Sequence, residues 1–215
     1  MKTASGKLLA LRVIIVLAVL CAVAGIVFGV TAAKGGSTAD TLSGKYYAAI
    51  EIQDYGTITV ELDADTAPIT VTNFVKLVNE GFYDGLTFHR IISGFMIQGG
   101  DPNGNGTGGS DEKIRGEFSA NGVENSISHE RGVISMARSS AYDSASSQFF
   151  IMHADATYLD GSYAAFGHVL SGMEVVDAIC EAVPVTDGNG TVAKEDQPVI
   201  TAIRMITAEE AGVTE

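Results

Sequence analysis

The 215-residue sequence contains few cysteines and few prolines. Its two cysteines are far apart: Cys21 lies within a long apolar run, and Cys180 stands alone in the region that follows. No disulfide can therefore form within that region, and a zinc site made of cysteine ligands is excluded. Only four prolines accompany 25 glycines, which favours a β-rich fold with many tight turns over a helical bundle.

Basic residues are scarce after residue 34. Of the 13 Lys and Arg residues, four precede Asp40 and nine follow it, whereas all 26 acidic residues lie from Asp40 onward. Nine minus 26 gives this part of the chain a net charge of −17. Because nucleic-acid affinity depends on Lys and Arg contacts to phosphates, so acidic a domain is not expected to bind nucleic acid. We expect instead a well-solvated surface that does not adhere to anionic lipid.

Patterns for metal, cofactor and hydrolytic sites are also missing. Four histidines are scattered without the spacing of metal ligands: His89, His129, His153 and His168. Residues 104–109 match the dinucleotide-binding pattern by letter, but no helix pattern begins after them. No serine stands in a G-x-S-x-G turn or suggests a Ser-His-Asp order, and Asp101 and Glu117 suit turn and surface positions. The sequence thus predicts no metal, no cofactor and no hydrolytic site.

A run of 21 uncharged, mostly apolar residues extends from Val13 to Ala33. As a helix rising ~1.5 Å per residue, this run spans the ~30 Å hydrocarbon core of a membrane. Three basic residues precede it, which places residues 1–12 in the cytoplasm under the positive-inside rule. We predict a transmembrane helix at 13–33, a flexible tether at 34–44, and a domain held at the cell membrane outside the cytoplasm.

A cleaved signal peptide is the alternative interpretation of the same segment. The apolar part of a signal peptide is usually ~7–15 residues long, which is shorter than this run. However, Val30-Thr31-Ala32 has the small residues of an acceptable cleavage site. The chain would then be secreted rather than anchored, and both interpretations export the domain that follows.

Alternating apolar and polar residues predict two strands joined by a tight turn, at 46–53 and 57–62. A helix with an apolar stripe is predicted to start within residues 65–68 and to end at Gly81, and a second helix is predicted at 173–182. Further short strands are predicted at 87–92, 96–99, 132–137, 149–153, 164–170 and 199–206. Many short strands and two helices without βαβ order indicate a closed antiparallel barrel capped by helices. This domain is expected to occupy residues 45–207, with a short tail at 208–215.

Three blocks of sequence stand out in this domain. They are FHRIISGFMIQGGD at 88–101, SQFFI at 147–151 and LDGSYAAFG at 159–167. They resemble the cyclophilin family of peptidyl-prolyl cis-trans isomerases, whose pattern is F-H-R-I-I/V-P-G-F-M-I/C-Q-G-G-D, then S-Q-F-F, then L-D-G…F-G. The resemblance covers about residues 46–206 and implies a mainly β fold: a closed eight-stranded antiparallel barrel capped by two α-helices. It also implies catalysis of rotation about X-Pro peptide bonds, without a metal or a cofactor.

The resemblance assigns roles to residues in and near these blocks. Arg90 is the expected catalytic residue, whose hydrogen bond to the proline nitrogen would stabilise the twisted peptide bond. Gln98 is expected to hold Arg90 or the substrate backbone. The expected proline pocket consists of Phe95, Met96, Phe150 and Leu159. The expected groove around it includes Gly106, Thr107, Ala137, Arg138 and Gln148, with Arg138 standing where the eukaryotic pattern has Asn.

Three residues depart from the family's eukaryotic pattern. Tyr158 replaces a Trp that contacts the drug cyclosporin, so drug binding is expected to be weak while activity persists. Tyr163 replaces a His that lines the proline pocket, and its hydroxyl is expected to donate the same hydrogen bond. Ser93 replaces a Pro and is expected to loosen its turn slightly. Residues 187–196 are predicted to form an added surface loop.

The predicted function is that of an active isomerase, outside the cytoplasm, that assists the folding of exported proteins. Its partners would be proline-containing polypeptides, its contact with the membrane would be limited to the N-terminal helix, and it is expected to be monomeric. Two alternatives use the same fold: a non-catalytic module that binds proline-containing segments, and an anchored assembly factor whose partner binds elsewhere. The joint presence of Arg90, Phe95, Gln98 and Phe150 favours the enzyme.

Overall fold

The computed structural model describes residues 41–214. The predicted membrane or signal segment at 13–33, and most of the predicted tether, lie outside the described residues. Within 41–214, neither helix combines the length and the apolar character needed to cross a bilayer.

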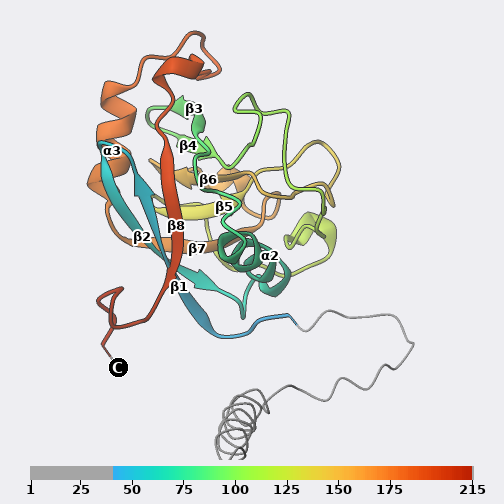
Figure 1. Cartoon of the computed structure of the whole chain (residues 1–215). Helices are drawn as coiled ribbons and strands as arrows, with labels where there is room; N and C mark the ends of the chain where they lie inside the picture. Colours follow the sequence, from blue (N-terminus) through green and yellow to red (C-terminus); the bar gives the residue numbers. More distant parts are fainter. Residues whose placement is uncertain (1–40, 215) are drawn as a thin grey trace, which may run out of the picture. The chain divides into compact units, whose positions relative to one another are not determined.

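The described residues form an eight-stranded sheet in which every neighbouring pair of strands is antiparallel (Figure 1). The strands are β1 (Lys45–Ile52), β2 (Gly56–Asp63), β3 (Phe88–Ile92), β4 (Met96–Gly99), β5 (Val133–Met136), β6 (Phe149–Met152), β7 (Ala165–Ser171) and β8 (Ile200–Ile206). Their order across the sheet is β3-β4-β6-β5-β7-β2-β1-β8. Each predicted strand is confirmed, with bounds that differ from the prediction by one residue at most.

The β1–β2 hairpin shows why the periodicity of the sequence located these strands so closely. Every second residue is buried from Ala48 to Ile52 on β1 and from Ile58 to Leu62 on β2, because the side chains of a strand alternate between its two faces. The chain reverses at Asp54, whose φ of 64° lies in the left-handed region that Asp tolerates better than most residues. The Tyr55 amide donates to the Ile52 carbonyl oxygen over 3.2 Å and closes the turn.

The sheet is open, so the prediction of a closed barrel is wrong. The edge strands β3 and β8 share no ladder in the described part of the chain. An isolated bridge between Thr87 and Val199 joins the segments before them, next to a hydrogen bond from the Gly85 amide to the Ile200 carbonyl oxygen over 2.8 Å. The Phe88 amide donates to the Pro198 carbonyl oxygen over 3.0 Å, but Pro198 has no N–H to return. A regular ladder therefore cannot extend through Pro198, and the strands curve into a half-barrel.

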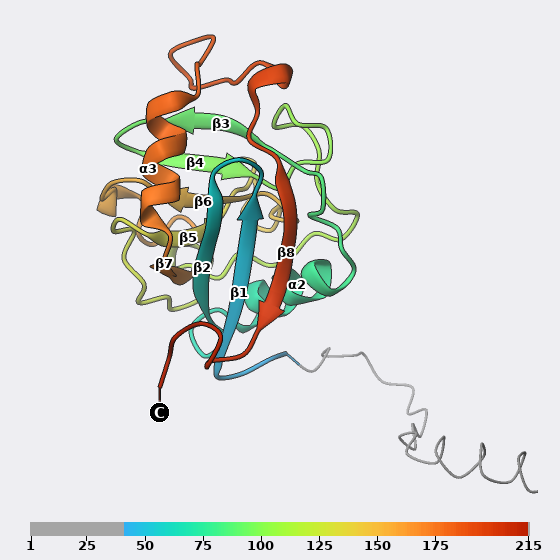
Figure 2. The same cartoon turned by 60° about the vertical axis from the view of Figure 1, so that its left-hand side comes forward.

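Two α-helices accompany the sheet in the described residues, α2 (Pro68–Asn79) and α3 (Met173–Ala182), and both were predicted. In Figure 2, α3 stands beside the β1–β2 hairpin, while α2 lies at the lower end of β8.

The helix α3 buries Val175, Val176 and Ile179, whereas Cys180 is only half-buried. Burial raises the pKa of the Cys180 thiol to about 11, which keeps it protonated and unreactive at neutral pH. Three short 3₁₀ turns complete the regular structure, at Ser119–Asn121, Thr157–Leu159 and Lys194–Asp196.

Glu117 caps the N-terminus of α2 from a buried position. Its carboxylate accepts hydrogen bonds from the Ile69 amide at 2.9 Å and the Thr70 amide at 2.8 Å, two of the donors that have no partner within the helix. Only 1% of Glu117 is exposed, so the surface position predicted for it is wrong. The free amides and the positive end of the helix dipole compensate for burying its carboxylate.

Two hydrophobic clusters form the core of residues 41–214. The larger lies between the inner face of the sheet and the two helices. The smaller is built on Met96, Val133, Phe150, Met152 and Ala165, and several half-buried apolar side chains pack on it from the surface. All four residues of β5 and of β6 are buried, so these strands give the surface side chains that pack on the smaller cluster a rigid support.

Candidate active site

The register of three neighbouring strands brings Arg90, Gln98 and Phe150 into one row. Arg90 on β3 pairs with Gln98 on β4, which in turn pairs with Phe150 on β6. Side chains at paired positions of antiparallel strands point to the same face of the sheet. Residues from two separate sequence blocks therefore meet above the smaller hydrophobic cluster.

This row forms one wall of a pocket of about 240 Å³, which we call the apolar pocket. Nine of the thirteen predicted site residues line it: Arg90, Phe95, Met96, Gln98, Ala137, Arg138, Phe150, Leu159 and Tyr163. Met96 and Phe150 are almost fully buried, at 1% and 5% exposure, and form its base. The pocket thus combines a fixed apolar base with a cationic rim made by Arg90 and Arg138.

Three more predicted residues, Gly106, Thr107 and Gln148, line a neighbouring pocket of about 280 Å³, the polar pocket. The remaining one, Tyr158, is 74% exposed and lines neither pocket. Its ring stacks on Phe95 with 6.2 Å between the ring centres. Tyr158 therefore stands at the edge of the apolar pocket, where it extends an aromatic surface toward solvent.

The Arg90 guanidinium is held by three hydrogen bonds. Its Nε donates to the carbonyl oxygen of Asn189 over 2.8 Å, one Nη donates to Asn189 Oδ1 over 3.2 Å, and the other donates to Gln98 Oε1 over 3.2 Å. Gln98 in turn donates to Gln148 Oε1 over 2.9 Å, and Gln148 donates to the Gly108 carbonyl oxygen over 2.8 Å. None of these acceptors is a carboxylate, so the guanidinium is oriented by neutral groups and keeps its charge available.

Asn189 belongs to the loop that the sequence suggested was merely added to the surface. In this loop the Asp187 carboxylate accepts hydrogen bonds from the Asn189 amide at 2.9 Å and the Thr191 amide at 3.0 Å. These hydrogen bonds, above all those from Thr191, lower the pKa of Asp187 and keep it ionised. The turn then pairs with β3, where the Ile91 amide donates to the Gly190 carbonyl oxygen over 2.8 Å.

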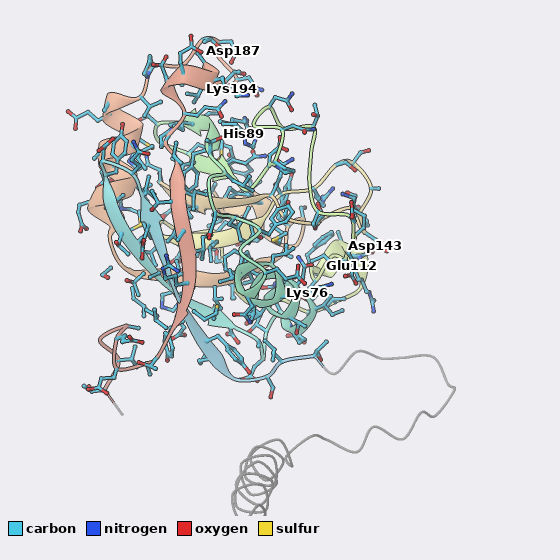
Figure 3. All side chains as sticks on the ribbon, in the orientation of Figure 1. Lys76, His89, Glu112, Asp143, Asp187 and Lys194 are labelled. Carbon is cyan, nitrogen blue, oxygen red and sulfur yellow. The ribbon has the colours of Figure 1, made fainter. Side chains whose placement is uncertain are left out.

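Sequence reasoning missed Asn189 as a site residue. The signal available was the Asp-Gly-Asn-Gly-Thr run at 187–191, whose side chains favour a tight turn. That run indicates the turn but not its neighbour, because Arg90 lies 99 positions away in the chain. Figure 3 shows Asp187 at the same end of the molecule as His89, the residue before Arg90.

Tyr163 and Arg138 pack together at the apolar pocket, next to Phe150. The Tyr163 ring meets Phe150 edge to face at 5.9 Å, and the Arg138 guanidinium lies 4.7 Å from the Tyr163 ring centre. Two Arg138 nitrogens also donate to the Ser162 carbonyl oxygen, over 3.0 and 2.7 Å. The structure assigns these packing roles to the Tyr163 ring, and the predicted hydrogen bond from its hydroxyl to a substrate stays a prediction.

Beneath Phe150, His129 connects Asp160 to Ser135. The distances are 2.8 Å from His129 Nδ1 to Asp160 Oδ1 and 3.0 Å from Nε2 to Ser135 Oγ. These are the three residue types of a hydrolytic triad, an arrangement that the sequence had not suggested. However, Ser135 is fully buried and His129 is 1% exposed, so neither reaches a substrate. The His129 ring stacks on Phe150 at 6.0 Å, which makes the series a support for the base of the pocket.

Asp101 holds the loop that carries Gly106. Its carboxylate accepts hydrogen bonds from the Asn105 amide at 3.0 Å and the Gly106 amide at 2.6 Å. These bonds and one from Asn103 lower the pKa of Asp101, although burial opposes them. The turn role predicted for Asp101 is confirmed, but its 1% exposure shows that a surface position is wrong for it as well. Groups of three or more acidic, His or Cys side chains placed to hold a metal are absent from the part of the chain described here.

Comparisons with known proteins agree with this architecture. Residues 47–209 match the family model described as cyclophilin type peptidyl-prolyl cis-trans isomerase/CLD. The chain is 45% identical over 144 residues to peptidyl-prolyl cis-trans isomerase B of Bacillus subtilis, covering 67% of this chain and 92% of that protein. It is also 45% identical over 135 residues to a peptidyl-prolyl cis-trans isomerase of Helicobacter pylori, covering 62% of this chain and 80% of that one.

Solved structures show the same fold. A crystal structure of a cyclophilin type peptidyl-prolyl cis-trans isomerase from Cryptosporidium parvum superimposes with a TM-score of 0.67 at 29% identity. The match covers 76% of this chain and 99% of that one. A second structure of the Cryptosporidium parvum protein, obtained in the presence of the dipeptide Ala-Pro, gives a TM-score of 0.66 at 31% identity.

Proposed function

This chain belongs to the cyclophilin-type peptidyl-prolyl cis-trans isomerase family and is an isomerase of that type, and we propose that the apolar pocket and Arg90 carry out its reaction. The substrate bond has partial double-bond character and a rotation barrier of ~18–20 kcal/mol. Uncatalysed rotation at X-Pro bonds therefore takes tens to hundreds of seconds. No bond is made or broken in this reaction, so the enzyme needs only to stabilise the twisted state.

In the proposed mechanism, Arg90 recognises the change at the proline nitrogen. In the planar bond the nitrogen lone pair is delocalised into the carbonyl group and accepts hydrogen bonds poorly. When the bond twists, the lone pair localises on the nitrogen and becomes a good acceptor. An N–H of Arg90 aimed at this nitrogen then stabilises the twisted state more than the planar state, which is what catalysis requires.

The observation that carries this proposal is the fixed guanidinium at the rim of the apolar pocket. Three hydrogen bonds orient Arg90 before any substrate arrives, so little reorganisation is needed during the reaction. The apolar pocket beside it suits a proline ring, whose burial against Met96 and Phe150 would hold the reacting nitrogen in place.

We test the role of Arg90 by isomerisation of a proline-containing peptide with the fragment Gly44–Glu215 and its Arg90→Ala variant. The variant should lose about 100-fold or more in kcat/KM, the range seen when a fixed electrostatic donor is removed. Arg204→Ala is the matched control, because Arg204 is an exposed arginine on β8 that pairs with Glu51. Circular dichroism should show that all three proteins are folded. Equal activity of Arg90→Ala and the parent would refute the role of Arg90, and a folded but inactive parent would refute the proposal as a whole.

We further propose that this isomerase works outside the cytoplasm on exported polypeptides, as a monomer held by its N-terminal segment. The 21 uncharged residues from Val13 to Ala33, preceded only by basic charges, support this location. Tyr158 in place of the family's Trp supports weak binding of cyclosporin.

A further inference from the structure

The polar pocket adjoins the apolar pocket along a shared wall. Gln98, Ala137 and Arg138 line both. Beyond this wall the polar pocket is lined largely by hydroxyl, amide and backbone groups, including those of Ser144, Ser146 and Gln148, together with the side chain of Lys113. A peptide whose proline fills the apolar pocket would therefore place a neighbouring residue at the polar one.

The cations of the two pockets differ from most others in the domain. Lys45, Lys76, Arg131 and Arg204 each form an ion pair with a carboxylate. Arg90, Lys113 and Arg138 form no such pair within residues 41–214, although this region holds most of the 26 acidic residues of the chain. Among the residues that the structure describes, no acidic one lines either pocket. The acidic surface of this domain is thus interrupted at the site by positive charge that its own carboxylates leave free.

Lys113 is held in place without being neutralised. Its ammonium lies 3.1 Å from Ser146 Oγ and 3.4 Å from the Ser110 carbonyl oxygen, both neutral acceptors. Arg138 likewise donates only to carbonyl oxygens, those of Ser139 and Ser162. A carboxylate entering the polar pocket would find two oriented cations and several hydroxyl donors. A neutral or basic side chain would gain nothing comparable.

We infer that the polar pocket binds the carboxylate of a substrate Asp or Glu near the isomerised proline, so that the enzyme prefers acidic proline-containing segments. This inference rests on the proposed function, since it names the substrate class of the same site. The two pockets share a wall, and an extended chain advances about 3.3 Å per residue. The acidic residue would therefore lie within about three positions of the proline. We assign this specificity to Lys113, which lines the polar pocket and not the apolar one. Arg138 serves both pockets, because it also packs on the Tyr163 ring.

The test uses the full-length chain in a mild non-ionic detergent and a set of peptides with one proline each. A single Glu is moved through the three positions on either side of the proline, and each peptide has a twin with Gln at that position. The quantity measured is the ratio of kcat/KM for the Glu peptide to that for its Gln twin. At one position the ratio should be about fivefold, as expected for one partly exposed ion pair, and it should fall toward one at high salt.

Two variants assign the preference to the pocket. Lys113→Gln should bring the ratio close to one at the position where the parent prefers Glu. Lys194→Gln removes the same charge from an exposed lysine that lines neither pocket and should keep the parent's ratio. In Figure 3, Lys194 lies at the far end of the molecule from Glu112, the residue before Lys113.

Each outcome decides a separate point. Catalysis with equal rates for Glu and Gln peptides at every position would overturn this inference and leave the isomerase intact. A preference for Glu that survives Lys113→Gln, or that Lys194→Gln also removes, would show that it arises from overall charge rather than from the pocket. Absence of catalysis on every peptide would instead overturn the proposed function.

Discussion

The site depends on buried polar residues as much as on those that line the pocket. His129 stacks on Phe150, and His89, the residue before Arg90, has only 4% of its surface exposed. Both ring nitrogens of His89 lack a hydrogen-bond partner among the described residues. Burial lowers the pKa of His89 and of His129, although the nearby Asp101 and Asp160 act in the opposite direction. Both rings are therefore held neutral in the folded protein at neutral pH.

This neutrality predicts a loss of stability in mild acid. The histidines of the unfolded chain take up protons below about pH 6.5, whereas the folded protein resists doing so. The free energy of unfolding should therefore have its highest value above this pH and decrease as the pH drops from about 7 to 5. Aspartates whose pKa is lowered on folding, such as Asp63 and Asp160, add their own loss only below about pH 4. Urea unfolding at several pH values measures this dependence.

Single substitutions assign the effect to its source. His89→Leu should make the free energy of unfolding less dependent on pH between 7 and 5, because it removes a buried imidazole. His168→Leu should leave that dependence as in the parent, because His168 is exposed on β7. The account would be wrong if the two variants gave the same dependence on pH.

Among the structural elements, the turn at 187–191 has the clearest link to catalysis. It lies against β3 and supplies two of the three acceptors that orient Arg90. Gly190 has a φ of 79°, and a Cβ there would collide with the Ile91 carbonyl oxygen. The close approach of the turn to β3 therefore requires glycine at this position.

Gly190→Ala should displace the turn and release the Arg90 guanidinium. We expect kcat to fall roughly tenfold or more, because a small misplacement of a catalytic group is costly, while KM changes less and the fold is kept. Gly188→Ala is the matched control, since nothing lies within 4 Å of a Cβ at Gly188. Steady-state kinetics with circular dichroism would separate the two. A Gly190→Ala enzyme with parental kcat, or equal damage from both variants, would show that the turn does not position Arg90.

At the scale of the whole molecule, charge is distributed unevenly. The region from Asp40 onward has nine basic residues against 26 acidic ones, yet three of the nine gather at the two pockets. We expect an acidic exterior to favour solubility and to repel anionic lipid, while the local cations would attract acidic segments of a polypeptide. Such a surface would suit the proposed location close to a membrane.

The proposed anchor is tested by the N-terminus of the protein isolated from its own cells. An anchored chain should be recovered with membranes, begin at or near Met1, and be cleaved by a protease added outside the cell. A mature N-terminus at Ala33 would instead show a cleaved signal peptide. Protection from the external protease would contradict export altogether.

The sequence by itself determined where the strands and helices lie. The periods of two and of about 3.6 residues are local properties, so the hairpin at Asp54 and the helix from Pro68 could be located closely. Seven of the nine residues around the apolar pocket stand in three long blocks with a family pattern, whereas Ala137 and Arg138 lie outside these blocks. The family pattern thus indicated these positions as a site, and the roles of the residues stay predictions.

Only the tertiary structure decided what depends on segments that meet across the chain. Whether the barrel closes depends on β3 meeting β8 at Pro198, which has no N–H for a ladder. Glu117 caps a helix that begins nearly fifty positions earlier, and the Asn189 turn orients Arg90 from 99 positions away. No local pattern encodes such contacts, because they arise when distant side chains satisfy one another's buried donors and acceptors.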